Sequence, residues 1–194
     1  MGWIVLGLLL IVVVYSYIKK QQKSPSSGWH IRWSPGMDRK LPGNNWTIDF
    51  PTNPEHHVHY VQWFNPPKLG KNISVKFRIK GNDFVPQEFP DRTATVSVLL
   101  QRKGDNWTAQ GKFASYRWYS NNTISMFEGE HSIFIPLTVS NWIDVYGGKD
   151  SKLFQEAIDN IENVGLVFGS AGGRGHGVYS VTPGSFELIS FEVV

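Results

Sequence analysis

The sequence of 194 residues contains no cysteine and, beyond its first segment, no run of lysine or arginine. Without cysteine there are no disulfides, thiolate metal sites or cysteine nucleophiles, so the fold must depend on its hydrophobic core. Lys19, Lys20 and Lys23 account for the net charge of +3, and the rest of the chain carries 16 basic residues against 16 acidic ones. Non-specific nucleic-acid binding requires a cationic patch. Nucleic acid is therefore not an expected partner.

Charge is also absent from the run Gly2 to Ile18, which holds 17 residues. As a helix this run would span about 25 Å, close to the hydrocarbon core of a bilayer. Trp3, Tyr15 and Tyr17 stand where interfacial aromatics are found. The segment lacks the basic start and small-residue cleavage site of a signal peptide. Residues 1–23 are therefore predicted to be a retained transmembrane anchor with a basic flank.

The orientation of this anchor is open from the sequence. Its lysines follow the apolar run, and the positive-inside rule would then keep the C-terminal domain cytoplasmic. An aromatic-rich β domain is more typical of envelope and secreted proteins. We expect a single-pass membrane protein with an extracytoplasmic domain, and a cytoplasmic domain stays as the alternative.

Residues 24–44 read as a linker and lead-in, and residues 45–194 as one β domain. The clearest strand is Asn72 to Lys80, where apolar and polar residues alternate. Short runs of similar pattern, separated by Gly, Pro, Asn and Asp clusters, predict further strands. These lie at 46–50, 58–64, 94–102, 111–119, 123–127, 131–137, 165–169, 177–181 and 185–194. In the last of them the alternation slips at Ser190, which suits a β-bulge.

One amphipathic helix is expected between residues 151 and 164, where apolar residues recur at three- and four-residue spacing. Asp150 and Ser151 offer an N-cap, and Gly165 is expected to end the helix. One short helix among about ten strands predicts an all-β fold, a jelly-roll-like β-sandwich, preceded by the transmembrane helix.

The glycine-rich segment Gly169 to Gly177 could be taken for a phosphate-binding loop. Such loops open a helix, whose N-terminus holds the phosphate. Here a strand and a turn follow, so phosphate binding is not favoured. Arg174 and His176 are the two large side chains of the segment. Both could reach a ligand at the rim of the sandwich.

Three histidines, His56, His57 and His59, lie close together in the sequence. On a strand, His57 and His59 would share a face and could begin a zinc or copper site, which would need a third ligand. The spacing supplies none, so no metal or other cofactor is predicted. Glu128 and Glu130 alternate as paired catalytic acids do, but Gly129 between them favours a turn that directs both into solvent.

The aromatic residues are the most informative feature of the chain after residue 23, which holds seven of the eight tryptophans. Sugars bind by stacking on exposed aromatic rings while polar neighbours take the hydroxyls. Strand alternation places Tyr116 and Trp118 on one face, and Arg117 and Tyr119 on the other. We select as candidate ligand-binding residues Tyr116, Arg117, Trp118, Trp142, Arg174 and His176.

The C-terminal part resembles the galactose-binding-like jelly rolls of non-catalytic carbohydrate-binding modules. The resemblance lies in the apolar strand Val164 to Gly169, the glycine-rich loop with Gly175-His-Gly-Val178, and the terminal strand Phe186 to Val194. It implies a non-catalytic domain that recognises a glycan or another envelope component, and the predicted N-terminal helix would tether this domain to a membrane. Two alternatives stay open. One is a scaffold that binds a protein partner, and the other is a glycoside-active enzyme using Glu128 or Glu130.

Overall fold

The computed structural model describes residues 27–194. The predicted anchor, Gly2 to Ile18, lies outside the described residues. Within residues 27–194 no helix has the length and apolar character needed to cross a membrane.

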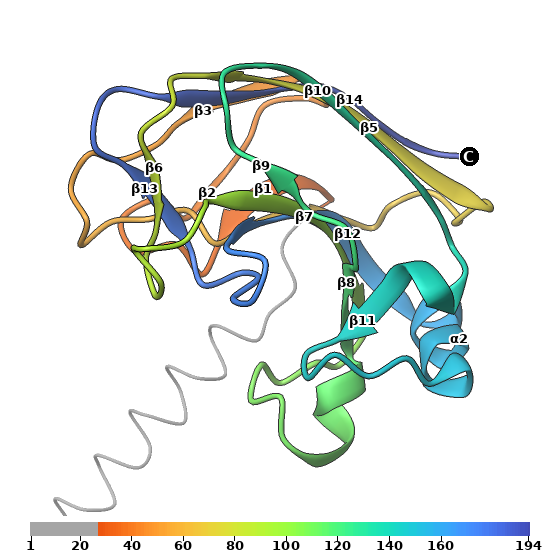
Figure 1. Ribbon diagram of the computed structural model, residues 1–194. Coiled ribbons are helices and arrows are strands. Elements are labelled where there is room, and N and C mark those ends of the chain that lie inside the picture. The colour runs from red at the N-terminus through yellow and green to blue at the C-terminus, as the bar shows by residue number, and fades with distance from the viewer. Residues whose placement is uncertain (1–26) are drawn as a thin grey trace, which may run out of the picture.

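The described chain is mostly β, with antiparallel pairing throughout and one α-helix (Figure 1). Sheet A has eight strands in the order β11-β8-β7-β12-β4-β1-β2, with β9 pairing on β7. Its strands are β1 (Gly28–Arg32), β2 (Arg39–Lys40), β4 (Tyr60–Phe64), β7 (Thr95–Arg102), β8 (Arg117–Ser120), β9 (Ile124–Ser125), β11 (Trp142–Asp144) and β12 (Ile161–Gly169).

Sheet B lies over sheet A as a second layer and has four strands in the order β10-β5-β14-β3 (Figure 1). These are β3 (Trp46–Asp49), β5 (Asn72–Lys80), β10 (Gly129–Pro136) and β14 (Ser185–Val193). A small third sheet pairs β6 (Phe84–Pro86) with β13 (Val178–Ser180). The arrangement confirms a β-sandwich-like fold with a single helix in the described chain.

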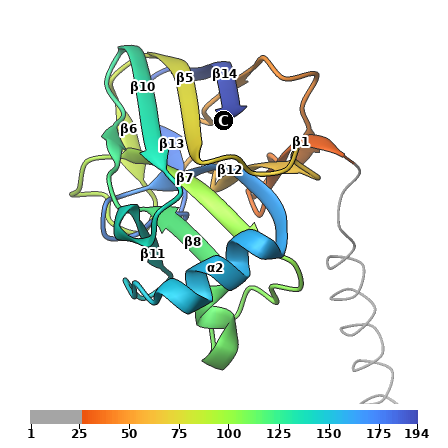
Figure 2. The ribbon, with the colours of Figure 1, turned by 90° about the vertical axis from the view of Figure 1, so that its right-hand side faces the viewer.

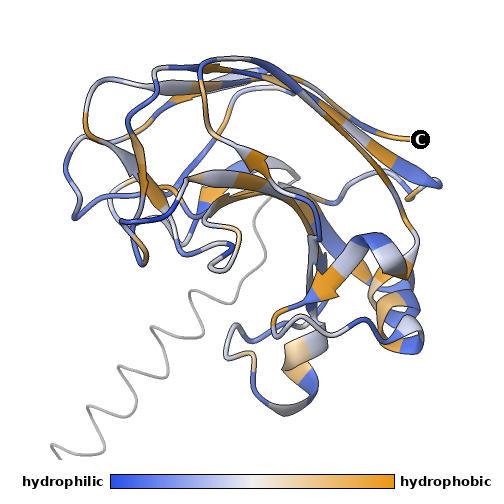
Figure 3. Ribbon diagram, viewed as in Figure 1, coloured by the Kyte–Doolittle hydropathy of each residue, from blue (hydrophilic) through white to orange (hydrophobic). Residues whose placement is uncertain are grey.

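The core fills the space between sheets A and B. In β5 the apolar positions Ile73, Val75, Phe77 and Ile79 are fully buried, while the residues between them are exposed or half-buried. Figure 3 shows this alternation of hydrophobic and hydrophilic positions along the strands. Sheet A contributes large buried side chains from the facing side. The alternating pattern of the sequence therefore identifies sheet B and its inner face correctly.

Helix α2 (Ser151–Asp159) lies beside β8 and β7 at one end of the sandwich (Figure 2). The Asp150 carboxylate caps it by accepting hydrogen bonds from the backbone N–H groups of Lys152 and Leu153, both at 2.9 Å. The helix ends before Asn160, not at Gly165 as the sequence suggests. Residues 161–164 instead begin β12, because pairing with β7 and β4 overrides their helical spacing.

Some of the other predicted elements have different boundaries in the structure. Residues 111–115 form a 3₁₀ helix, η1 (Gly111–Ser115), so the strand predicted over 111–119 begins only at Arg117.

The lead-in, residues 24–44, forms β1 and β2, and β1 pairs with β4 in sheet A. Its Trp29 is buried and stacks on Trp63, with ring centroids 5.6 Å apart. The register of β14 shifts between Leu188 and Ser190, which confirms the predicted bulge.

Two strands of sheet A, β7 and β8, are buried on both faces, unlike the strands of sheet B. Seven consecutive residues of β7, from Thr95 to Gln101, are buried, and so are all four of β8. Sheet A curves, and its outer face is the concave one, bordered by the glycine-rich loop and the loop that joins β7 to η1 (Figure 1). Polar side chains buried on this concave face lead to the candidate site.

Candidate functional site

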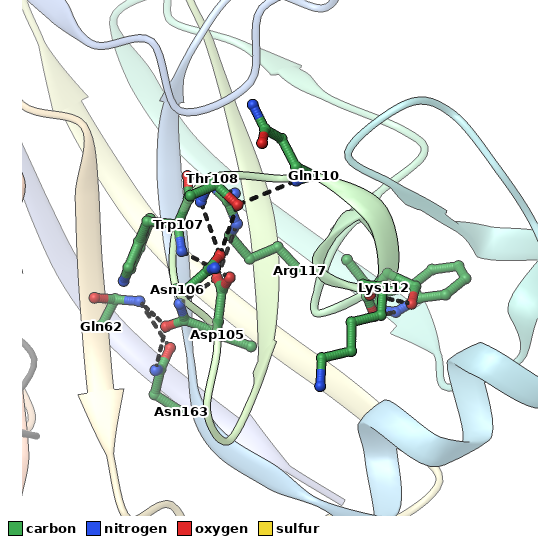
Figure 4. Close-up of polar contacts among 12 residues, drawn as sticks. Gln62, Asp105, Asn106, Trp107, Thr108, Gln110, Lys112, Arg117 and Asn163 are labelled. Atoms are coloured by element: carbon green, nitrogen blue, oxygen red, sulfur yellow. Dashed lines mark hydrogen bonds and ion pairs between the residues drawn. The ribbon is translucent and has the colours of Figure 1, made fainter.

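Three amide side chains are buried side by side on the concave face of sheet A. They are Gln62 of β4, Asn163 of β12 and Gln101 of β7, none more than 2% exposed. Gln62 Nε2 donates to Gln101 Oε1 at 2.8 Å and to Asn163 Oδ1 at 2.9 Å, and Asn163 Nδ2 donates to Gln101 Oε1 (Figure 4). Because an unpaired buried amide is costly, these bonds hold the three strands in one register.

The amide network continues to an ion pair. Gln101 Nε2 donates to Asp105 Oδ2 at 2.8 Å, and the same oxygen lies 2.9 Å from Arg117 Nε (Figure 4). The N–H at Arg117 Nε does not point at this oxygen well enough for a hydrogen bond, so the contact is an ion pair. Arg117 Nη2 donates to the Trp107 carbonyl at 3.2 Å. Since the Asp105 side chain is fully buried and that of Arg117 is 7% exposed, the guanidinium is fixed in position.

The charge states at this position follow from burial and from the neighbouring groups. Burial lowers the pKa of Arg117, but Tyr119, Asp105 and Tyr60 together raise it by more, so the guanidinium stays charged. Burial raises the pKa of Tyr119 well above its ordinary value, with Tyr60 adding to the effect. Tyr119 is therefore a neutral phenol that offers a hydroxyl group, not a base.

The loop between β7 and η1 positions Trp107 over this face. Asp105 Oδ1 accepts from the Trp107 backbone N–H at 3.0 Å, and Asn106 Oδ1 accepts from the N–H and hydroxyl of Thr108 (Figure 4). Trp107 has φ of 66°, a conformation that a bulky residue adopts only when its surroundings enforce it. Here the side-chain hydrogen bonds within the loop hold Trp107 in this conformation.

The Trp107 ring is the centre of a cluster of aromatic and cationic groups. Its centroid lies 5.0 Å from that of Tyr60 and 5.0 Å from that of Trp33, and the Arg117 guanidinium carbon lies 4.9 Å from it. Trp33 also has positive φ, at 55°. Strained backbone that holds two packed tryptophans over a concave face is typical of functional sites.

The glycine-rich loop forms the opposite rim because its glycines allow close approach. Gly175 has φ of +77°, and a Cβ there would overlap the Tyr60 hydroxyl. The loop directs Arg174 toward the concave face, where Nη2 donates to the Asn121 carbonyl at 2.7 Å and Nη1 to the Ala171 carbonyl at 2.5 Å. His176 Nδ1 lies 2.5 Å from Glu88 Oε2.

These elements enclose a cavity of about 260 Å³ on the concave face. It is lined by Tyr60, Trp107, Ala109, Arg117, Tyr119, Ile143, Asp144, Val145, Gly172, Arg174 and His176. Asp144 is the one acidic residue among them, and its Oδ1 accepts from the backbone N–H groups of Tyr146 and Gly148, at 2.9 and 2.7 Å. The cavity thus combines an aromatic ring, phenol hydroxyls and fixed cations without a pair of acids.

The six residues selected from the sequence separate into three locations. Arg117, Arg174 and His176 line the cavity. Trp118 and Trp142 are fully buried in the main core, where both rings contact Phe154 of α2. Tyr116 lies on the other side of β8, in a separate hollow. Alternation places Arg117 and Trp118 on opposite faces, as the sequence predicts.

Tyr60, Trp107 and Asp144 line the cavity but are not among the residues selected from the sequence. Tyr119 carried a usable signal, since alternation places it beside Arg117. Trp107 stands in a polar loop whose position over the sheet depends on Asp105, and no local pattern shows that contact. Tyr60 follows the histidine cluster and is itself buried.

The histidines share a face as predicted. The His57 and His59 ring centroids lie 4.4 Å apart, and His59 Nδ1 lies 2.7 Å from the Gly175 carbonyl oxygen. Burial lowers the pKa of His59 to about 4, and His57 nearby adds to the effect. Over residues 27–194 no three metal-binding side chains are gathered in one place. The pair therefore supports the glycine-rich loop as neutral rings.

Glu128 and Glu130 lie away from the concave face. Both are exposed, and Glu130 forms an ion pair with Arg78 of β5 on the outer face of sheet B. Arg78 also contacts Glu187 of β14, with Nη1 to Oε2 at 2.9 Å. Glu130 and Glu187 therefore form a surface ion-pair network with Arg78.

Comparison with known proteins gives little beyond this geometry. No protein-family model matches the chain, and no curated protein matches its sequence. Among solved structures, the chain is similar to a Bacteroides thetaiotaomicron protein provisionally described as a glycoside hydrolase, with a TM-score of 0.33 and 10% identity over 69% of this chain. The match spans 40% of that protein. A similarity of this size says nothing about the chemistry of the site.

Proposed function

We propose that the protein is a non-catalytic glycan-binding domain of jelly-roll type, tethered to a membrane by Gly2 to Ile18, and that the glycan binds in the concave cavity of sheet A. The observation that carries the proposal is the cavity itself, in which the Trp107 ring lies beside the fixed guanidinium of Arg117. Sugar rings present apolar C–H faces and hydroxyl groups, and this pairing of an aromatic ring with polar donors matches both.

The charge balance of the cavity favours an uncharged sugar. Arg117 is neutralised by Asp105, and His176 is paired with Glu88. Arg174 and Asp144 add one cation and one anion to the lining. A ligand with hydroxyl groups satisfies such donors and acceptors without bringing a charge that must be desolvated.

The absence of paired acids supports a binding role. Hydrolysis of a glycoside generally uses two carboxyl groups that flank the bond, about 5–10 Å apart. Within the cavity lining, Asp144 stands alone and one of its oxygens already accepts two backbone hydrogen bonds. The Asp105 side chain is fully buried and paired with Arg117, so it cannot contact a ligand in the cavity. No residue of the lining is thus equipped as the second acid.

A scaffold function receives less support. The outer face of sheet B, the obvious docking surface, carries the Arg78, Glu130 and Glu187 network and Lys76. Stable protein interfaces are depleted of charge at their centres.

The test is binding to an array of neutral and acidic polysaccharides, followed by titration calorimetry. Trp107→Ala and Arg174→Ala should each lower affinity about tenfold or more, as expected for residues at the centre of a binding site. Phe134→Ala and Lys76→Ala, on the outer face of sheet B, should bind as wild type does. Wild-type protein that binds no glycan, or binding that survives Trp107→Ala unchanged, would overturn the proposal.

A further inference from the structure

A second cavity, of about 330 Å³, lies on the other side of the β8–β11 edge of sheet A. Its lining comes from η1, the residue that follows η1, helix α2, the end of β7 and the end of β11. The residues are Arg102, Gly111, Lys112, Ala114, Ser115, Tyr116, Asp144, Leu153 and Glu156.

Asp144 lines both cavities, which makes them neighbours. The chain between β7 and β8 is the wall they share, because it supplies Trp107 and Ala109 to the first cavity and five of the six residues 111–116 to the second. Its end is attached to β11 by a hydrogen bond from the Val145 N–H to the Ala114 carbonyl, at 3.3 Å. The segment between β7 and β8 therefore shapes both cavities.

The two cavities repeat one chemical arrangement. In the first, the Arg117 guanidinium carbon lies 4.9 Å from the centroid of the Trp107 ring. In the second, the Arg102 guanidinium carbon lies 4.6 Å from the centroid of the Tyr116 ring. Each arginine is also paired with a carboxylate, Arg102 with Glu156 at 3.0 Å. Each cavity thus offers an aromatic ring and an oriented, neutralised guanidinium.

Size favours a ligand longer than either cavity. Pockets for drug-sized ligands are roughly 300–1,000 Å³, so about 260 and 330 Å³ each suit a unit near the size of one or two sugar rings. A chain of such units that passes Asp144 would use both aromatic rings, and linked sites gain affinity because the second contact is intramolecular.

We propose that the two cavities are subsites for one oligosaccharide, with Trp107 in the first and Tyr116 in the second. This inference rests on the proposed glycan-binding function. It adds that the ligand is an extended chain and that Tyr116 contributes only when the chain is long enough to reach it.

The experiment is titration calorimetry of the full-length chain in mild detergent with size-graded oligomers, one to six units long, of glucose, N-acetylglucosamine and galacturonate. For a series that binds, affinity should rise at least tenfold between the shortest and longest oligomers. Tyr116→Ala should lower affinity about tenfold for the long oligomers and leave the shortest unchanged. Trp107→Ala should weaken all lengths, and Phe134→Ala none.

The outcomes separate the two proposals. Binding that depends on Trp107 but is independent of length and of Tyr116 would overturn the second subsite and leave the proposed function standing. Failure of all three series to bind would overturn both. Circular dichroism and thermal unfolding of each variant keep a folding defect from being taken for lost binding, and Tyr116→Phe, which retains the ring, should preserve the length dependence.

Discussion

Arg117 and Asp105 form a buried ion pair beneath the cavity, with Nε and Oδ2 2.9 Å apart and side chains 7% and 0% exposed. The pair connects the interior of sheet A to the binding face, because Asp105 also accepts from Gln101 and from the Trp107 backbone N–H. One carboxylate therefore orients both the guanidinium and the tryptophan of the proposed site.

The first prediction concerns this carboxylate. Asp105→Asn leaves the Arg117 charge buried without its counter-ion, so the free energy of unfolding should fall by about 3 kcal/mol. Urea denaturation followed by tryptophan fluorescence measures it. Glu130→Gln removes a partner of Arg78 in an exposed ion pair and should change stability little. Equal losses in the two variants would contradict the role given to Asp105.

The second prediction concerns the close approach of the glycine-rich loop. Gly175→Ala introduces a Cβ that overlaps the Tyr60 hydroxyl at a residue with φ of +77°, and should destabilise the domain by about 2 kcal/mol or more. Gly104→Ala is the matched control, since its φ is +82° and a Cβ there meets nothing within 4 Å. It should cost only about 1 kcal/mol. Thermal unfolding compares the two, and similar losses would mean that the loop does not pack as described.

The third prediction concerns pH. Burial lowers the pKa of His59 from 6.5 to about 4, so between these values the unfolded chain binds a proton that the folded chain excludes. Stability should be unaffected by His59 above pH 6.5, fall as the pH drops toward 4, and level off below it. The loss from pH 7.5 to 4.5 should be smaller in His59→Gln than in wild type by about 2 kcal/mol. Identical pH profiles for the two proteins would remove His59 as the cause.

The fourth prediction concerns the N-terminal segment. If Gly2 to Ile18 anchors the chain, the full-length protein should remain in the membrane pellet after alkaline washing, and a chain lacking residues 1–23 should appear in the supernatant. A reporter fused after Val194 should be active on the extracytoplasmic side. Activity of the reporter on the cytoplasmic side would reverse the predicted orientation.

Sequence patterns predict sheet B better than sheet A for a physical reason. One face of sheet B is exposed to solvent, so apolar and polar residues alternate clearly along β5. Even the bulge of β14 at Ser190 can be seen in the sequence as a break in this alternation. In sheet A, β8 and most of β7 are buried on both faces, so their residues are buried regardless of polarity. Alternation separates Arg117 from Trp118 but does not say which faces the core. The cavity itself depends on contacts between residues far apart in sequence, such as Tyr60 and Gly175.

Binding of a glycan at Trp107 can be followed through the indole N–H signals in a nitrogen-15 NMR titration of the full-length chain. The probe is the glycan that binds most tightly in the array. If the glycan binds there, the Trp107 and Trp33 signals should shift with saturation, while those of the buried Trp118 and Trp142 should stay fixed. Saturable binding that leaves Trp107 unmoved would contradict it.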